Sequence, residues 1–340
     1  MSRKIWRPIF FCLTFVIGGI LLLWLVERAG WQEILTQIFA FGLLPFLGYV
    51  GISFVNFLVY VWRWRVILQA HLPKKDVPSF WRLFLHRMSG YAVGYLTPAA
   101  QVAGEPARIA MLALDGVPVK IGTSAVTLDI AFELVSFVLF VMAGFGFAAL
   151  QNFQGIDTSV AIGILIFLFG GLMLFFATLV WGHGFLSPVA RRLLAIRWKF
   201  ISRTAQQLIE MESLMSAFLR KSRWILLFVL LCSFVTIGFR VVEMYYLSYF
   251  FGILLTPGQA FLSATIPGLV LFLPIPGGLG LYEGSYTSIF AALNLPLNAV
   301  AFTFIVRLRD IVFIAIGLIH LLQQGGKAVI KKGSSYEKSV

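Results

Sequence analysis

Long runs of apolar residues alternate with short polar segments along the chain, and they predict membrane-spanning helices. Three of these runs, residues 8–26, 39–61 and 160–181, contain no charged side chain. About 20 apolar residues in a helix are enough to cross the roughly 30 Å hydrocarbon layer of a bilayer. Each of these three runs is therefore predicted to be a spanning helix.

Three further runs are as long but carry charged residues inside them. They are residues 121–150, with Asp129 and Glu133; residues 224–250, with Arg240 and Glu243; and residues 297–322, with Arg307, Arg309 and Asp310. A charged side chain at the bilayer centre costs from about 2.5 to more than 10 kcal/mol unless it faces partners or water. We therefore expect six spans, and we expect the charges in three of them to have a structural or functional role.

Two other apolar stretches are interrupted by helix breakers. Residues 88–104 contain Gly90, Gly94, Pro98 and Gly104, and residues 255–306 contain Pro267, Pro274, Pro276, Gly277, Gly278 and Gly280. Proline removes a backbone donor and clashes with the preceding helical turn, so a straight helix is excluded there. Broken backbone at membrane depth is tolerated where protein buries it or where it lines a cavity. Both stretches are predicted to be re-entrant hairpins of two half-helices.

The two hairpin regions match each other when the chain is compared with itself. An offset of 178 residues superposes Pro98 on Pro276, Glu105 on Glu283, Pro118 on Pro296 and Asp129 on Arg307. This register predicts an internal duplication of residues 39–150 in residues 224–322, with spans 8–26 and 160–181 outside it. A chance match is the alternative. If the N-terminus is cytoplasmic, the two halves start on opposite sides of the membrane and are inverted repeats.

Charge supports this topology. The chain of 340 residues has a net charge of +13, and the basic residues gather in alternate loops, among them Lys74, Lys75, Arg82, Arg87, Arg191 and Arg192. Cytoplasmic loops of membrane proteins carry such an excess. We expect both termini in the cytoplasm of a bacterial cell, with residues 331–340 as a tail.

Residues 187–222 have apolar positions at helical spacing and predict one amphipathic helix on the cytoplasmic surface; a soluble linker helix is the alternative.

Composition excludes a soluble domain and several kinds of site. Hydrophobic residues make up 60% of the chain and charged residues 12%, and the mean hydropathy is +0.92, so residues 1–330 are predicted to be one all-α polytopic membrane domain. Cys12 and Cys232 both lie in predicted spans, and the four histidines have no metal-ligand spacing. We find no nucleotide, zinc or nucleophile motif. We expect no cofactor, no metal, no enzymatic activity and no nucleic-acid partner.

The intramembrane charges are the candidate functional residues. Asp129 and Glu133 are four residues apart, and Arg240 and Glu243 are three apart, as are Arg307 and Asp310, so each pair shares a helical face. A structural ion-pair network is one interpretation. The other is a polar path for a lipid headgroup, with arginines for phosphate and acids for a cationic or hydroxylated group or for a coupled proton.

The predicted half-helices add two acids to this set. Glu105 and Glu283 each follow a glycine or proline break, where an acid favours the helix dipole. Transporters with inverted repeats also place substrates at such half-helix ends. The candidate substrate-binding residues are Glu105, Arg108, Asp129, Glu133, Arg240, Glu243, Pro276, Gly277, Gly278, Glu283, Arg307 and Asp310.

The same motifs carry a family resemblance. The segments are Gly104-Glu105-Pro106-Ala107-Arg108 followed by Asp129, then Pro276-Gly277-Gly278-Leu279-Gly280-Leu281-Tyr282-Glu283, and Val306-Arg307-Leu308. They resemble the flippase-like transmembrane domain family, which includes the membrane portion of lysylphosphatidylglycerol synthases, the multiple peptide resistance factors. The resemblance covers nearly the whole chain. It implies lipid translocation and does not imply the aminoacyltransferase activity.

We therefore expect a flippase that moves a lipid with a polar headgroup across the inner membrane. The expected substrates are anionic or aminoacylated phospholipids or a lipid-linked sugar. One alternative is a membrane scaffold that binds a separate lipid-modifying enzyme. Another is a membrane-embedded transferase in which Glu105 or Asp129 acts as a lone base. Membrane lipids, such an enzyme and a second copy of the chain are the expected partners.

Overall fold

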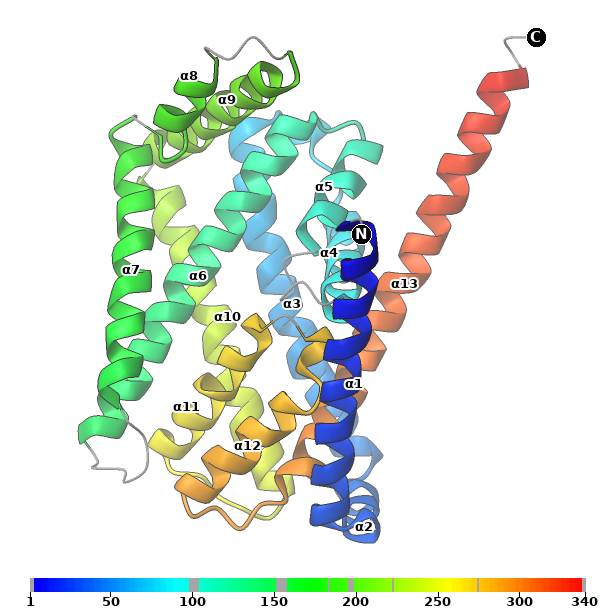
Figure 1. Cartoon of the computed structure of the whole chain (residues 1–340), viewed down its shortest axis with the longest axis vertical. Coiled ribbons are helices and arrows are strands. Elements are labelled where there is room, and N and C mark those ends of the chain that lie inside the picture. Colours follow the sequence, from blue (N-terminus) through cyan, green and yellow to red (C-terminus); the bar gives the residue numbers. More distant parts are fainter. Residues whose placement is uncertain are drawn as a thin grey trace.

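The chain folds into helices throughout its described part. The computed structural model describes residues 3–97, 104–150, 158–182, 184–194, 199–221, 223–273 and 275–337, and all regular structure in these ranges is helical (Figure 1). The α-helices are α1 (Arg3–Ala29), α2 (Trp31–Phe41), α3 (Leu43–His71), α4 (Phe80–Leu96), α5 (Gly104–Leu114), α6 (Val119–Leu150), α7 (Thr158–Val180), α8 (Ser187–Leu194), α9 (Lys199–Lys221), α10 (Arg223–Phe250), α11 (Pro257–Thr265), α12 (Leu281–Ala292) and α13 (Ala299–Glu337). Short 3-10 helices are η1 (Lys74–Asp76), η2 (Pro267–Phe272) and η3 (Pro276–Gly278).

Each predicted span lies within or largely overlaps one long helix: α1, α3, α6, α7, α10 or α13. Three helices among the described residues are long and apolar enough to cross a membrane: α3, residues Val119–Gly146 of α6, and α10. The apolar segment Ile166–Val180 of α7 is shorter. The prediction of an all-helical fold with apolar helices of membrane-spanning length is thus confirmed for the described residues.

The two stretches with helix breakers form pairs of short helices. One pair is α4 and α5, and the other is α11 with η2 followed by η3 with α12. In Figure 1 the first pair lies in the upper half of the molecule and the second in the lower half. The chain breaks at η3, where Gly277 (φ 54°) and Gly278 (φ 62°) adopt left-handed conformations that glycine allows without steric cost. This break was predicted from Pro276 and the two glycines. Pro98 and Pro274 lie outside the described residues.

The bounds of the helices follow the same 178-residue register as the sequence. Shifted by 178, α3 would cover 221–249 and α5 would cover 282–292, while α10 covers Arg223–Phe250 and α12 covers Leu281–Ala292. The packing corresponds too, because α4 contacts α13 and, in the matching positions, α11 contacts α6. The helices α3 and α10 pack against each other and run in opposite directions (Figure 1).

Helix α3 occupies the centre of the arrangement, since it contacts α4, α6, α10 and α13. The α4–α13 contact joins segments far apart in sequence. The hydroxyl of Ser89 donates to the carbonyl oxygen of Gly317 at 3.2 Å, and the rings of His86 and His320 approach to 3.1 Å between nitrogens. The four histidines, which have no common spacing in sequence, therefore include one pair in direct contact.

The segment 187–222 differs from the prediction of one helix. It contains two helices, α8 and α9, which pack against each other at the end of the molecule where α7 ends and α10 begins (Figure 1). The buried carboxylate of Glu212 on α9 accepts hydrogen bonds from the backbone N–H groups of Phe185, Leu186 and Ser187, at 2.6–3.0 Å. An acid there satisfies orphan amides at the start of α8, which explains why a helix begins at Ser187. Residues 195–198 and 222 lie outside the described part.

Candidate functional site

A cluster of buried ion pairs joins four helices of the first half. Its members are Arg63, Arg87 and Arg108 with Glu105, Asp129 and Glu133, and we refer to it as the three-arginine cluster. One oxygen of Asp129 accepts from Arg63 at 2.7 Å, and the other accepts from Arg87 at 2.9 Å and from Arg108 at 2.7 Å. Three cations and three acids cancel in formal charge. This part of the site fits the structural ion-pair network.

The prediction from the sequence missed one member of this cluster, Arg63, and misplaced another, Arg87. Arg63 lies beyond the predicted span 39–61, and its side chain is fully buried. Arg87 was assigned to a cytoplasmic loop, and this was wrong: it lies in α4 with a side chain only 12% exposed, bound to Asp129 and Glu133. The signal was available in the two acids of the run 121–150, because buried carboxylates require cationic partners and neither acid had one nearby in sequence.

A second set of contacts joins the end of α4 to η3, α12 and α13, and we call it the hairpin junction. The carboxylate of Glu283 accepts from the backbone N–H of Gly280 at 2.8 Å and from Nε of Arg307. Arg307 also donates to the hydroxyl of Tyr95 at 2.8 Å and to the carbonyl of Gly277 at 3.2 Å. A Cβ atom on Gly277 would lie 2.6 Å from the Tyr95 ring. The end of α4 therefore contacts η3 at Gly277, and Glu283 caps α12.

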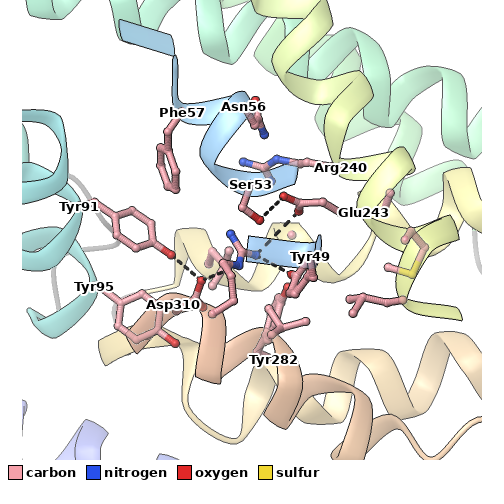
Figure 2. A pocket seen from close by; sticks show the side chains of 18 of the residues that line it. Tyr49, Ser53, Asn56, Phe57, Tyr91, Tyr95, Arg240, Glu243, Tyr282 and Asp310 are labelled. Atoms are coloured by element: carbon pink, nitrogen blue, oxygen red, sulfur yellow. Dashed lines mark hydrogen bonds and ion pairs between the residues drawn. The ribbon is translucent and has the colours of Figure 1, made fainter. Parts of the chain in front are cut away.

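A polar cavity of about 180 Å³ lies between the halves, and we call it the central cavity (Figure 2). Helices α3, α4, α6, α10, α11, α12 and α13 contribute to its wall, together with residues of η2 and Gly277 of η3. Six tyrosines line it: Tyr49, Tyr60, Tyr91, Tyr95, Tyr282 and Tyr286. One water molecule needs only about 10–15 Å³ of such volume, so the cavity has room for a small polar group.

Acids of the central cavity are held by hydroxyl groups and by one shared cation. Ser53 donates to Glu243 at 2.6 Å, and Tyr91 donates to Asp310 at 2.7 Å (Figure 2). Arg309 lies 3.8 Å from Glu243 and 3.4 Å from Asp310. One guanidinium thus faces two carboxylates.

A second cavity, of about 340 Å³, adjoins the central one, and we call it the hairpin cavity. Its wall includes Glu105 and Arg108 of α5 and a set of apolar side chains: Ile130, Leu134, Phe137, Ile237 and Leu271. The two cavities share seven residues: Phe57, Arg87, Tyr91, Glu133, Arg240, Gly268 and Leu271. A charged cavity therefore borders one with an extensive apolar wall.

The predicted site residues fall into three groups. Glu133, Arg240, Glu243, Gly277 and Asp310 line the central cavity, and Glu105 and Arg108 line the hairpin cavity. Asp129 lines neither and belongs to the three-arginine cluster. Glu283, Arg307, Pro276 and Gly278 line neither and belong to the hairpin junction or lie next to it.

The tyrosines and the polar face of α3 were not predicted as site residues. Polar residues Tyr49, Ser53, Asn56 and Tyr60 recur at three- and four-residue spacing in the apolar run 39–61, and all four line the central cavity. Residues at this spacing share one face of a helix. A polar stripe on a lipid-length helix was therefore a signal in the sequence.

Comparison with known proteins gives a family and a distant relative. The family model described as "Lysylphosphatidylglycerol synthase TM region" matches residues 11–317. A protein described as "UPF0104 membrane protein" from Methanothermobacter thermautotrophicus is 30% identical over 132 residues, which cover 37% of this chain and 35% of the relative. The chain thus aligns with about a third of that relative's length. No solved structure matches the chain.

Proposed function

The chain belongs to the family of lysylphosphatidylglycerol synthase transmembrane regions and is a multi-pass membrane protein, and from this premise we propose that it is a flippase for a lipid with a polar headgroup. The central cavity is the observation that carries this proposal. Charges from both halves meet there, and a charge inside a membrane protein is costly unless it faces a partner or a wetted path. A charged lipid headgroup would be such a partner for the charges of the central cavity.

The neighbouring hairpin cavity supports a lipid rather than a water-soluble solute. Its apolar side chains, among them Phe137, Ile237 and Leu271, continue from the charged wall. A lipid has the same change of polarity, from headgroup to acyl chain. We place the headgroup in the central cavity and the start of the chains along the hairpin cavity.

The symmetry of the helices supports alternating access. The matched bounds of α3 with α10 and of α5 with α12, and the opposite placement of the short-helix pairs in Figure 1, favour two inverted repeats of span, re-entrant hairpin and span. In this proposal six helices span a bacterial inner membrane and both termini are cytoplasmic. Movement of one half against the other exposes the central cavity to each leaflet in turn.

The proposal is tested by reconstitution in liposomes. Lipids labelled on the headgroup, of anionic, zwitterionic, aminoacylated and sugar-linked classes, are added to the inner leaflet, and an external quencher reports their arrival outside. We expect movement of at least one class, and loss of it in Asp310→Asn, which removes a cavity acid. Lys120→Gln, in an exposed ion pair with Glu210, is the matched control and should transport normally.

The experiment separates this function from the two alternatives. A scaffold would move no lipid of any class, with or without a proton gradient. A transferase would convert a lipid into a new product in the same liposomes, which mass spectrometry would detect. Either result would contradict the flippase proposal, in which the protein transports lipid without chemical change.

A further inference from the structure

Six arginines lie in or beside the two cavities and the hairpin junction, and five of them have an acid partner. Arg63, Arg87 and Arg108 pair within the three-arginine cluster, Arg307 pairs with Glu283, and Arg309 pairs with Glu243 and Asp310. Among the described residues no carboxylate lies within 4.0 Å of Arg240. Arg240 is therefore the one of these six cations without a direct ion pair to an acid of the described chain, and Glu133 acts on it only at longer range.

Arg240 is placed to meet a ligand in either cavity. Its side chain lines both cavities, and its guanidinium carbon lies 5.8 Å from the centre of the Phe137 ring. A Cβ atom on Gly268 would lie 3.5 Å from one of its Nη atoms, so a glycine leaves room beside the guanidinium. A guanidinium with open donors is the protein group best suited to the oxygens of a phosphate.

The opposite charge remains uncompensated in the same cavity. Arg309 supplies one positive charge to two carboxylates, Glu243 and Asp310, which leaves one negative charge in excess. The amide oxygen of Asn56 is a further acceptor in this wall; it is buried and has no hydrogen-bond partner in the described part of the chain. Glu243 follows Arg240 by one turn of α10, so the two unbalanced charges are neighbours on one face (Figure 2).

Two of the tyrosine rings in the central cavity already face arginine side chains. The guanidinium of Arg87 lies 4.1 Å from the centre of the Tyr60 ring, and that of Arg309 lies 5.1 Å from the centre of Tyr49. Rings already engaged in this way have less capacity for a ligand ammonium. A positive group on the ligand is therefore expected to bind at the acids.

We propose that the substrate is a zwitterionic phospholipid, with its phosphate on Arg240 and its ammonium group at Glu243 and Asp310. This inference rests on the proposed function and departs from the substrates expected from the sequence, which were anionic or aminoacylated phospholipids or a lipid-linked sugar. An anionic headgroup would leave the excess carboxylate uncompensated, and a headgroup of net positive charge would exceed the one negative charge available. Only a ligand with one charge of each sign cancels both.

A binding experiment tests the charge balance directly. The full chain in neutral detergent is titrated with short-chain phospholipids that share their acyl chains and differ in headgroup: ethanolamine (zwitterionic), glycerol (anionic) and lysyl-glycerol (cationic). Native mass spectrometry gives each Kd. We expect the ethanolamine lipid to bind roughly tenfold more tightly than either other probe, as one charge-assisted contact warrants. Tightest binding of the glycerol or lysyl-glycerol probe, or equal binding of all three, would overturn the proposal.

Two variants test the phosphate-binding and the ammonium-binding residues separately. Arg240→Gln should weaken all three probes by about tenfold or more, because each carries a phosphate. Glu243→Gln should abolish the preference for ethanolamine over glycerol without unfolding the protein. Arg220→Gln and Glu210→Gln on exposed positions of α9 are the controls, with unchanged affinities. Unchanged affinity in Arg240→Gln, or unchanged preference in Glu243→Gln, would remove the assignment. Because Glu243→Gln is neutral and similar in size, it decides the question even if Arg240→Gln fails to fold.

Failure of this inference is distinguishable from failure of the flippase proposal. Transport of lipids in liposomes with no preference for the zwitterion would contradict the substrate class alone. Selective binding in detergent without any transport would contradict the flippase alone.

Discussion

At the residue scale, one carboxylate organises most of the buried charge in the first half. Asp129 is fully buried and accepts from Arg63, Arg87 and Arg108, which come from three different helices. Arginine presents its donors in a planar fork that suits such sharing. Asp129 is therefore expected to contribute to stability, whereas Arg240 and Glu243 are the residues proposed to bind the ligand.

This distinction predicts the effect of Asp129→Asn. Removing the charge leaves three buried arginines with only Glu105 and Glu133, and breaking a buried pair typically costs about 3–5 kcal/mol. We expect a loss of this size in the free energy of unfolding of the purified protein. Glu210→Gln breaks the exposed pair with Lys120 at 2.9 Å and should cost less than about 1 kcal/mol. Equal stability of the two variants would contradict the role given to Asp129.

The sequence identified the acids of this network and Arg108 but not the other two partners, Arg63 and Arg87, and the reason is physical. An acid in an apolar run stands out because burial of a charge is costly, and this holds whatever the fold. Its partner depends on which helices meet: Arg63 is 66 residues from Asp129, and Arg87 is 42 residues away. Only packing brings them together. The convergence of six tyrosines on one cavity depends on packing in the same way.

At the element scale, close backbone contact defines the first hairpin. A Cβ atom on Gly104 would lie 2.2 Å from the carbonyl oxygen of Gly90, so α4 and α5 approach at two glycines. In the second pair of short helices, Gly277 and Gly278 act through positive φ instead. The breaks could be predicted from sequence because glycine and proline act locally. The division of 187–222 into α8 and α9 could not, because it depends on Glu212 reaching amides 25–27 residues away.

The glycine contact predicts the effect of Gly104→Ala. The added methyl group meets backbone rather than a movable side chain, so α4 and α5 must separate, at a cost of about 1–3 kcal/mol. Thermal unfolding of the purified variant measures this. Gly163→Ala on α7 is the control: its Cβ would meet nothing within 4 Å, and the substitution should not destabilise the protein. A destabilised control with an unaffected Gly104→Ala would refute the packing argument.

At the scale of the whole molecule, each hairpin joins one half to the other. The first helix of each hairpin packs on the last long helix of the opposite half, α4 on α13 and α11 on α6. The proposed transport by relative movement of two halves would therefore require these contacts to change. Helices α6 and α11 approach closely at Gly144, whose Cβ would lie 3.1 Å from the hydroxyl oxygen of Thr265.

This contact predicts that a disulfide between Gly144→Cys and Thr265→Cys will arrest transport. In a variant whose own Cys12 and Cys232 are replaced by serine, oxidation should lower lipid movement in liposomes at least about tenfold by preventing conformational exchange, and reduction should restore it. The two single-cysteine variants, treated with the same oxidant, are the controls. Full transport with the disulfide formed would show that α6 and α11 stay together during the cycle.

The contact between α4 and α13 also bears on how the protein is made. Helix α4 precedes α13 by about two hundred residues, and its Ser89 hydroxyl binds the carbonyl of Gly317. Helix α13 is synthesised after all the other helices. During synthesis α4 and α5 therefore lack their contact with α13 until translation is nearly complete. A chain truncated before α13 would expose the face of α4 that α13 covers. We expect such a chain to be degraded by the quality-control proteases that act on unassembled membrane segments.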